Sequence, residues 1–484
     1  MVTRRVRAPR IDFGDLRREL KLPEQFPLAA QREAEQAATV PLPATDRTDV
    51  PFVTIDPATS RDLDQAVCLV RRAGGYRVHY AIADVASYVP AGGPLEAETW
   101  RRGQTVYLPD GKVPLHPETL SEGAASLLPD ADRAAVVWTI DLDADGETTS
   151  VHLERARIRS RAKLDYLGVQ EDVDAGRTPE PIALLPEIGK LLMARALARG
   201  AVNLPMPEQE IEPDGHGFRL VLRAPVPVEG YNAQISLLTG MAAAGLMLDG
   251  RLGLLRTMPA ARPDAVARLR TAATTLGVDW PPDASVGEVV ATLDPATPRG
   301  AAFLDQAAEL MRGAGYTAFA GDPPDDPVHS AVGAPYAHVT APLRRLADRY
   351  ATEVALSVHA GREVPEWACA ALPRLPEVMA VSDRTASTAE RGAVDLTEAM
   401  LLAGRVGEEF DAAVIDVDGP RRTAAAPAAP AASPTEPRPP GGTVALDDPP
   451  VRARCDGPLP LGQRVRVRLV EADPGRRRVL FAVV

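Results

Sequence analysis

Three carboxylates share one short loop in the stretch Thr54-Ile55-Asp56-Pro57-Ala58-Thr59-Ser60-Arg61-Asp62-Leu63-Asp64-Gln65-Ala66. The apolar runs on either side, residues 51–55 and 66–70, predict one strand that enters the loop and one that leaves it. Carboxylates this close repel one another unless a positive charge lies among them. Hard oxygen ligands suit Mg²⁺ or Mn²⁺, which keep water molecules for a phosphate substrate, so the loop predicts a metal site.

The alternative for such a loop is an ordinary solvated acidic turn. Two features favour the metal site. Asp56 directly follows the first predicted strand, where a side chain is held rigidly, and Arg61 adds a fixed cation to the loop.

Four further blocks of sequence follow the acidic loop. They are residues 79–89 (HYAIADVASYV), 120–133 (LSEGAASLLPDADR), 160–166 (SRAKLDY) and 336–348 (YAHVTAPLRRLAD). In this order, and over most of the chain, the five segments resemble the ribonuclease II family of 3′-to-5′ exoribonucleases, whose catalytic part is the RNB domain.

The resemblance implies an α+β fold, in which an RNB-type catalytic domain (a sheet with helices packed on one side) is followed by a small C-terminal OB-fold-like β-barrel. It also implies Mg²⁺ or Mn²⁺ as cofactor and single-stranded RNA as partner. Asp56, Asp62 and Asp64 fall on three of the family's four active-site aspartates, and Gln65 stands at the fourth. A neutral amide is a weaker metal ligand than a carboxylate, so one of two metals would be held less firmly.

The resemblance also implies roles for single residues. Asp62, Asp64 and Arg344 are the expected catalytic residues, and the expected metal ligands are Asp56, Asp62, Asp64 and Gln65. The expected RNA contacts within the RNB-type catalytic domain are Tyr107, Tyr166, Arg345 and Glu390.

Arg344 has an argument of its own. Its planar guanidinium matches two oxygens of a phosphate, which a lysine cannot do. The alternative is that Arg344 and Arg345 merely open a helix that starts near Pro342. Because cations disfavour a helix N-terminus, their presence there favours a functional role.

The bulk composition limits the setting of the protein. The 484 residues suffice for a catalytic domain and one small module. The sequence has no long apolar run that predicts a membrane span. No apolar segment follows the basic N-terminus, so a secretory signal is not predicted. Three distant cysteines show no disulfide or metal spacing. We therefore expect a cytoplasmic monomer with no membrane partner and no dinucleotide cofactor. The net charge of −12 disfavours a duplex binder, but an enzyme that threads a single strand needs only a locally basic channel.

The chain divides into three predicted parts. Residues 1–46 form a short leader with helices at 13–22 and 27–38, which is too short for the cold-shock barrels that the family carries in this place. Residues 47–402 form the catalytic domain, with strands at 76–83, 135–142 and 148–155 and a hairpin turn at 143–146. Its predicted helices, at 235–248, 265–276, 301–311 and 344–359, come later and so gather on one side of the sheet.

Residues 405–484 form the predicted barrel, with strands at 410–417, 451–454, 463–470 and 479–484. An Ala/Pro-rich insertion at 422–442 has no periodicity and is expected to be disordered. In the third strand, Arg464, Arg466 and Arg468 alternate with apolar residues and share one face. That face is either an ordinary solvated surface or a surface that follows the phosphates of RNA.

The leading hypothesis is a metal-dependent 3′-to-5′ exoribonuclease that degrades single-stranded RNA to 5′-mononucleotides, in RNA turnover or processing. Gln65 motivates one alternative, an RNA-binding protein on the same fold with reduced or lost catalysis. A metal-dependent phosphodiesterase of small nucleotides is the third possibility. Retention of Asp56, Asp62, Asp64 and Arg344 favours the enzyme, because a decayed site has no reason to keep carboxylates that repel one another.

Overall fold

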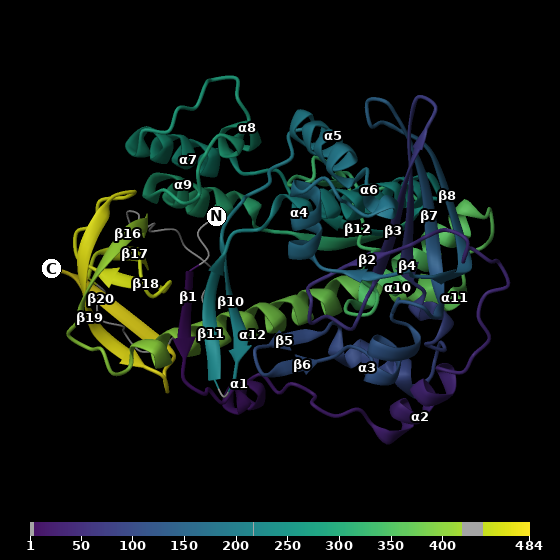
Figure 1. The fold of residues 1–484 in the computed structure, drawn as a ribbon, viewed down its shortest axis with the longest axis horizontal. Helices are drawn as coiled ribbons and strands as arrows, with labels where there is room; N and C mark the ends of the chain where they lie inside the picture. The colour runs from purple at the N-terminus through teal and green to yellow at the C-terminus, as the bar shows by residue number, and fades with distance from the viewer. Residues whose placement is uncertain (1–3, 216, 419–438) are drawn as a thin grey trace.

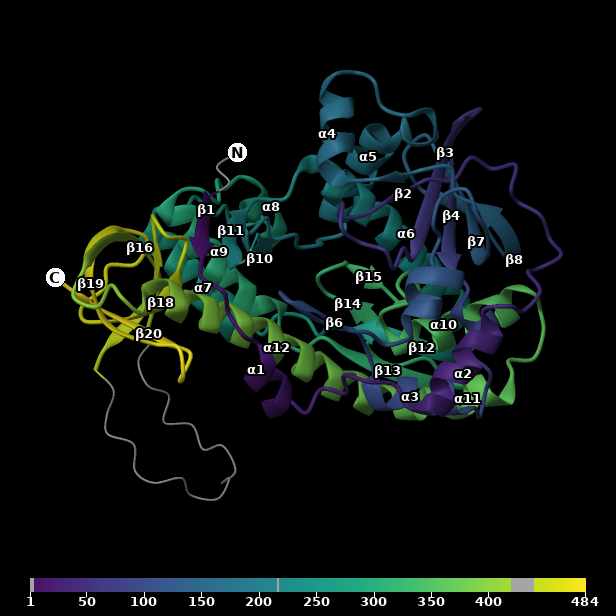
Figure 2. The same cartoon turned by 60° about the horizontal axis from the view of Figure 1, so that its bottom comes forward.

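The computed structural model describes residues 4–215, 217–418 and 439–484 (Figure 1). No helix in these ranges is both long and apolar enough to cross a membrane. A β-barrel lies at one end of the molecule and a four-stranded sheet at the other, and Figure 2 shows the same arrangement from a second side.

The four-stranded sheet is antiparallel, in the order β3-β4-β7-β8. Successive residues of a strand point to opposite faces, so large side chains such as Tyr80 and Trp138 gather on one face and small ones such as Ala81 and Ala135 on the other. The strands are β3 Gln65–Arg72, β4 Gly75–Ala83, β7 Asp132–Asp143 and β8 Thr148–Arg159.

The main helical layer covers the face with the large side chains. Its helices are α4 Tyr166–Asp174, α5 Leu185–Ala198, α6 Pro227–Asp249, α10 Leu346–His359 and α11 Glu366–Ala371. It includes the predicted helices at 235–248 and 344–359, whereas those predicted at 265–276 and 301–311 do not lie on the sheet and form a core of their own. The small-residue face packs against the alanines of α2 (Leu28–Ala37) and against Leu95 of α3 (Pro94–Arg102), which form a thinner cover.

Helix α12 (Leu375–Leu402) connects the two ends of the molecule. It runs from the sheet-bearing part to the barrel and packs along the way on β5, β13 and β20 (Figure 2). This helix was not among those predicted from the sequence.

The closed barrel has the strand order β16-β17-β18-β20-β19, which confirms the expected OB-like module. Its strands are β16 Glu409–Val417, β17 Gly441–Leu446, β18 Arg452–Asp456, β19 Arg464–Asp473 and β20 Arg478–Val483. Residues 422–438 of the expected disordered insertion lie outside the described residues. Its last two residues, Gly441 and Gly442, instead begin β17, and a Cβ on Gly442 would come within 2.1 Å of the Asp416 carbonyl oxygen.

The N-terminal segment is more than a leader of helices. Strand β1 (Arg4–Ala8) pairs with β11 (Gly217–Arg223), which pairs in turn with β10 (Glu208–Asp214), so the expectation of helices alone for residues 1–46 was incomplete. The first expected helix is α1 (Gly14–Glu19) and the second is α2.

The remaining elements complete the path of the chain. A helical insertion of α7 Pro263–Leu276, α8 Val286–Ala291 and α9 Pro298–Ala308 lies between β12 Leu252–Thr257 and β13 Gly315–Ala320, and α9 packs on β16. The short strands are β2 Thr54–Ile55, β5 Val106–Leu108, β6 Gly111–Val113, β9 Lys163–Leu164, β14 Val328–His329 and β15 Ala334–Pro335.

Candidate active site

The acidic loop begins at a parallel strand pair. Strand β2 pairs with β9, and the Asp56 N–H donates to the Leu164 carbonyl oxygen at 3.1 Å. The loop ends where Gln65 begins β3, in the central sheet. Both ends of the loop are therefore fixed by backbone hydrogen bonds to strands.

Two side chains from the blocks recognised in the sequence hold the middle of the loop. Lys163 donates through Nζ to the carbonyl oxygens of Ala58 and Ser60, each at 2.6 Å. Ser126 Oγ donates to the Arg61 carbonyl at 2.7 Å and accepts from the Leu63 N–H at 2.9 Å. Two of the sequence blocks are therefore in direct contact with the acidic loop.

The segment before α10 closes the loop from the opposite side. The Leu343 N–H donates to Asp64 Oδ1 at 2.7 Å, and Arg344 Nε lies 3.7 Å from Asp64 Oδ2. Asp64 is buried, whereas the Arg344 side chain is 51% exposed and lines the cleft. Helix α10 begins at Leu346, so Arg344 precedes the helix, and the expectation that a helix starts near Pro342 was wrong.

Gln65 is engaged at both ends of its amide. Its Nε2 donates to the Thr340 carbonyl at 2.7 Å, and its Oε1 accepts from the hydroxyl of the buried Tyr80. The Thr340 carbonyl oxygen can only accept a hydrogen bond, so the NH₂ group of the Gln65 amide must face it. The contact with Thr340 therefore fixes the orientation of the amide. Gln65 thus links the acidic loop to the segment before α10, and we treat it as a hydrogen-bonding link rather than as the metal ligand that the resemblance implied.

Asp62 is contacted from the hairpin of β5 and β6. The Tyr107 hydroxyl donates to Asp62 Oδ2 at 3.0 Å, and Lys112 Nζ lies 3.0 Å from the same oxygen. Lys112 Nζ also lies 2.8 Å from Glu122 Oε1, and Arg61 forms a longer ion pair with Glu122 at 3.4 Å.

For the two other carboxylates, Asp56 and Asp64, burial outweighs the positive charges nearby. Burial raises the pKa of Asp56 to about 6 against the opposing charge of Lys163, and it raises the pKa of Asp64 well above its usual range against the charge of Arg344. Asp56 Oδ2 is buried and has no hydrogen-bond partner among the residues that the structure describes.

These residues fit a hard divalent cation. The free oxygen of Asp56 and the buried Asp64 are the oxygen donors that Mg²⁺ and Mn²⁺ prefer. Across the described ranges, however, no three His, Cys, Asp or Glu side chains stand close enough together to form a complete metal site. Water or substrate oxygens would supply the remaining ligands, as is usual for Mg²⁺.

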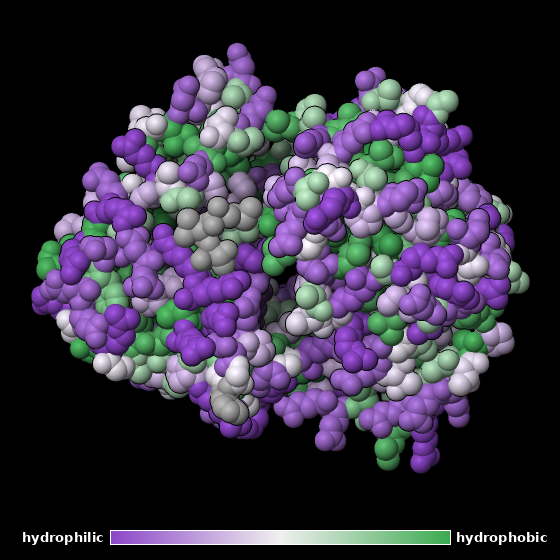
Figure 3. All heavy atoms as spheres, in the orientation of Figure 1, coloured by the Kyte–Doolittle hydropathy of each residue, from purple (hydrophilic) through white to green (hydrophobic). Residues whose placement is uncertain are grey.

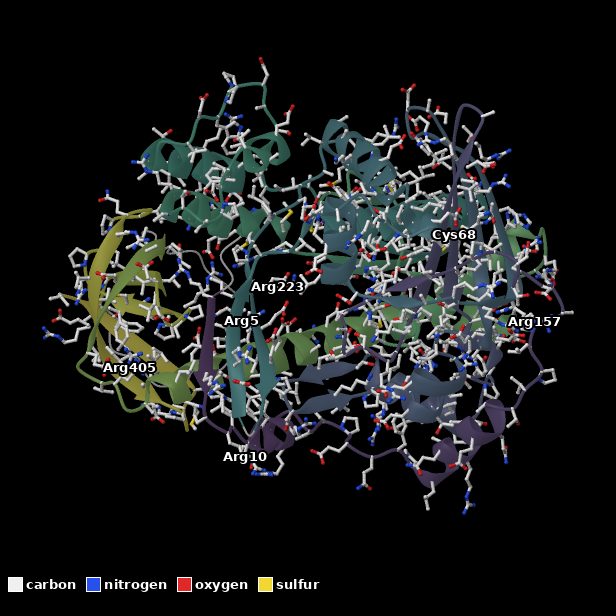
Figure 4. All side chains as sticks on the ribbon, viewed as in Figure 1. Arg5, Arg10, Cys68, Arg157, Arg223 and Arg405 are labelled. Atoms are coloured by element: carbon white, nitrogen blue, oxygen red, sulfur yellow. The ribbon has the colours of Figure 1, made fainter. Side chains whose placement is uncertain are left out.

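The acidic loop lines a cleft of about 1590 Å³. Tyr107, Tyr166 and Arg344 lie on its walls together with the aspartates, and Arg10 and Phe218 line it from the side of the β1-β11-β10 sheet. Figure 3 shows this face of the molecule hollowed through its middle, and Figure 4 shows Arg10 just beyond β1, near one end of β11.

The predicted aromatic contacts lie in this cleft. Tyr107 is 49% exposed, so its ring is accessible for stacking by a nucleobase. Tyr166 is the first residue of α4, and its hydroxyl accepts a hydrogen bond from Asn232 Nδ2 at 3.4 Å.

Two other predicted RNA contacts lie elsewhere. Arg345 Nε and its Nη2 donate to the buried Asp348, at 2.5 and 2.8 Å, so its guanidinium is already paired. Glu390 is exposed on α12 and does not line the cleft.

The arginines of the barrel share one face of β19, as predicted, and are 52–58% exposed. Each one pairs with a carboxylate: Arg464 with Asp447, Arg466 with Asp411 and Glu409, and Arg468 with Glu409. The face is therefore close to neutral in charge rather than strongly basic.

The contacts of Lys112 and Lys163 were not predicted, although Lys163 lies within one of the recognised blocks and Lys112 lies between two of them. A signal was present in the composition. The chain has four lysines, Lys21, Lys112, Lys163 and Lys190, and two of them contact the acidic loop.

The chain is similar in sequence to a family of nucleases. The sequence model of the RNB domain matches residues 44–356, and that of the RNase II-type exonuclease C-terminal S1 domain matches residues 408–484. Ribonuclease R of Aquifex aeolicus is 26% identical over 381 residues, which cover 74% of this chain and 52% of that protein. The chain spans about half the length, or less, of the curated relatives that it matches.

Solved structures share the fold. Mycoplasma genitalium RNase R, solved in complex with ribose-methylated single-stranded RNA, matches with a TM-score of 0.82 and 18% identity, over 98% of this chain and 77% of that one. Yeast Ssd1, described as a pseudonuclease, matches with a TM-score of 0.64 and 18% identity, over 78% of this chain and 49% of that one.

Proposed function

The chain belongs to the RNB domain family, with an RNase II-type S1 domain after the RNB domain, and we propose that it is a metal-dependent 3′-to-5′ exoribonuclease. Its substrate would be single-stranded RNA, and its products 5′-mononucleotides. The observation that carries the proposal is one cleft that brings together three aspartates, Arg344 and two tyrosines from segments far apart in the sequence.

The aspartates would hold the cation. Asp56 presents a buried oxygen without a hydrogen-bond partner, and Asp64 is fixed by the Leu343 N–H. When bound, a divalent cation activates water as a nucleophile and stabilises the leaving oxygen of a phosphodiester. We propose Mg²⁺ as this cation, with Mn²⁺ as a substitute, because both favour carboxylate oxygens.

Arg344 would bind the phosphate under attack. Its side chain is half-exposed beside Asp64, and its planar guanidinium can donate two parallel hydrogen bonds to phosphate oxygens. The charge that develops on these oxygens in the transition state would be stabilised by a donor that is already in place.

The two tyrosines would hold the end of the RNA. Tyr107 exposes its ring at the cleft, and Tyr166 lies at the N-terminus of α4, on the cleft wall. Bases of a single strand stack on aromatic rings, and contacts to the 2′-hydroxyl distinguish RNA from DNA. Mycoplasma RNase R, which has the same fold, has been solved with single-stranded RNA, which supports this partner.

The remaining parts of the proposal concern the setting of the enzyme. We propose a cytoplasmic monomer that acts in RNA turnover or processing, and a contribution of the barrel arginines to binding of long RNA. For that contribution the arginines must exchange their carboxylate partners for phosphates.

One observation favours a second candidate, an RNA-binding protein with reduced or lost catalysis. Gln65 stands where the family has an acid, and its amide is engaged in hydrogen bonds. The similar fold of Ssd1, a pseudonuclease, shows that the fold does not require activity. The retained Asp64–Arg344 pair supports the enzyme over this alternative.

Product analysis tests the proposal. Uniformly labelled single-stranded RNA is incubated with the full chain and Mg²⁺, with and without a chelator, and the products are separated by chromatography. We expect 5′-mononucleotides that depend on Mg²⁺. Nucleoside 3′-phosphates, or products of unchanged yield in the chelator, would contradict the proposal.

A further inference from the structure

Lys112 bridges two carboxylates at the edge of the candidate site. Its Nζ lies 3.0 Å from Asp62 Oδ2 and 2.8 Å from Glu122 Oε1. The side chains of Lys112 and Glu122 are each 19% exposed and that of Asp62 is 10% exposed, so water screens this bridge less than an ordinary surface ion pair. An ammonium between two carboxylates occupies the kind of position that a second metal ion would take.

The geometry of the hairpin fixes Lys112 in this position. Tyr107 of β5 and Lys112 of β6 are direct cross-strand partners, so their side chains leave the hairpin on the same side. Both of them contact the same oxygen of Asp62. A metal ion at that oxygen would have to displace two donors at once.

Position 65, at the end of the acidic loop, offers no acid for a second ion. Gln65 is neutral, and both ends of its amide are engaged, with Thr340 and Tyr80. Among the buried carboxylate oxygens of the described residues, Asp56 Oδ2 is the one without a hydrogen-bond partner.

The charge of the site leads to the same conclusion. Among the described residues, four carboxylates (Asp56, Asp62, Asp64 and Glu122) are in contact or close interaction with four cations (Arg61, Lys112, Lys163 and Arg344). One divalent cation would therefore leave a site with two positive charges for the negative phosphodiester. Two such cations would leave four, in a partly buried cleft where uncompensated charge is costly.

We propose that the site binds a single divalent cation, on the side of Asp56 and Asp64, and that Lys112 is a positioning residue whose ammonium replaces a second metal ion between Asp62 and Glu122. The use of this cation in RNA hydrolysis rests on the proposed function. The number of bound cations does not, because cation binding is measured without RNA.

The test is a titration of the metal-stripped full chain with Mn²⁺ alone, in which electron paramagnetic resonance counts the free ion. The parent is expected to bind one Mn²⁺ per chain. Lys112→Met frees the carboxylates of Asp62 and Glu122, so this variant is expected to bind a second, weaker Mn²⁺. Lys112→Arg keeps the cation and is expected to bind one.

Lys190→Met is the matched control, because Lys190 is an exposed lysine on α5 and does not line the cleft. It loses the same charge and should bind one Mn²⁺ like the parent. Thermal unfolding shows which variants are folded. The number of Mn²⁺ ions bound by the parent chain tests the proposal even if a variant does not fold.

Two ions per parent chain would overturn the proposal, and so would one ion in a folded Lys112→Met variant. A chain that binds one Mn²⁺ but does not hydrolyse RNA would contradict the proposed function and leave this inference intact.

Discussion

At the scale of single residues, the site depends on contacts between segments far apart in the sequence. The Leu343 N–H that fixes Asp64 lies 279 residues away along the chain, and Gln65 reaches Thr340 over a similar span. Each contact holds one rotamer of one side chain. Small changes of side-chain shape at these positions should therefore affect chemistry more than folding.

Arg344→Lys should reduce the turnover number by roughly 10²-fold, because a point charge cannot replace two parallel hydrogen bonds to the phosphate. The fold should be unchanged, since Arg344 is half-exposed. Single-turnover kinetics at saturating RNA measure the effect, with Arg362→Lys, an exposed arginine after α10, as the control. Parent-like turnover in Arg344→Lys would show that this arginine has no part in the chemistry.

Gln65→Asp should raise the Mg²⁺ concentration needed for half-maximal activity. Aspartate lacks the Nε2–H that donates to the Thr340 carbonyl, and its shorter side chain loses the Tyr80 contact. A Mg²⁺ titration of activity measures this. A lower half-maximal Mg²⁺ concentration would mean that the added acid binds metal, as the family resemblance implied, and that the amide is not a necessary link.

At the scale of elements, those that the sequence predicted carry their own periodic pattern. The strands on both sides of the acidic loop and the helix that became α10 have such patterns, although α10 begins at Leu346, two residues later than predicted. Strand β1 has a short, arginine-rich sequence, and it becomes a strand because it pairs with β11, Arg4 opposite Leu222. The same limit applies to Lys112, because its contact with Asp62 exists only once the β5–β6 hairpin folds over the loop.

The junction between α12 and the barrel should depend on pH through Glu398. Its Oε1 accepts from the Arg452 N–H and from Gln209 Nε2, both at 2.8 Å, and burial nevertheless raises its pKa to about 7. The unfolded chain ionises this group at a lower pKa. Between the two pKa values the folded state binds the extra proton, so the free energy of unfolding falls as pH rises through this window.

Glu398→Gln replaces the titrating carboxyl group with an amide. The free energy of unfolding of this variant should therefore rise relative to that of the parent as pH rises from about 5.5 to about 8. Urea unfolding at the two pH values measures the difference, and Glu366→Gln, an exposed acid of α11, serves as the control. An equal difference between parent and variant at both pH values would show that Glu398 does not titrate in this range.

The arginine face of β19 can be tested by removing its partners. In the double variant Glu409→Gln, Asp411→Asn, Arg466 and Arg468 lose the carboxylates with which they pair. If the face follows RNA, long RNA should bind more tightly, and the slope of log affinity against log salt should steepen by about 0.7 for each new phosphate contact. Short oligomers that fill only the cleft should bind as before. An unchanged slope with long RNA would identify the face as solvated surface.

At the scale of the whole molecule, two parts flank the cleft and α12 joins them. The sheet-bearing part supplies the aspartates, and the side of the β1-β11-β10 sheet supplies the wall with Arg10 and Phe218. Helix α12 packs on both that sheet and the barrel, so the relative position of the two sides follows from one long helix. This arrangement suits a substrate that is held between the acidic loop on one side of the cleft and the wall on the other side.

The most direct test of exoribonuclease activity uses single-stranded RNA labelled at its 5′ end, incubated with Mg²⁺ and either the parent or Asp64→Asn. Asparagine keeps an oxygen for the Leu343 N–H and removes the charge that faces the cation, so the variant should bind RNA nearly as the parent does. We expect a descending ladder from the 3′ end with the parent, and bound but intact RNA with Asp64→Asn. Bound and intact RNA with the parent, or a ladder of equal rate with Asp64→Asn, would contradict this expectation.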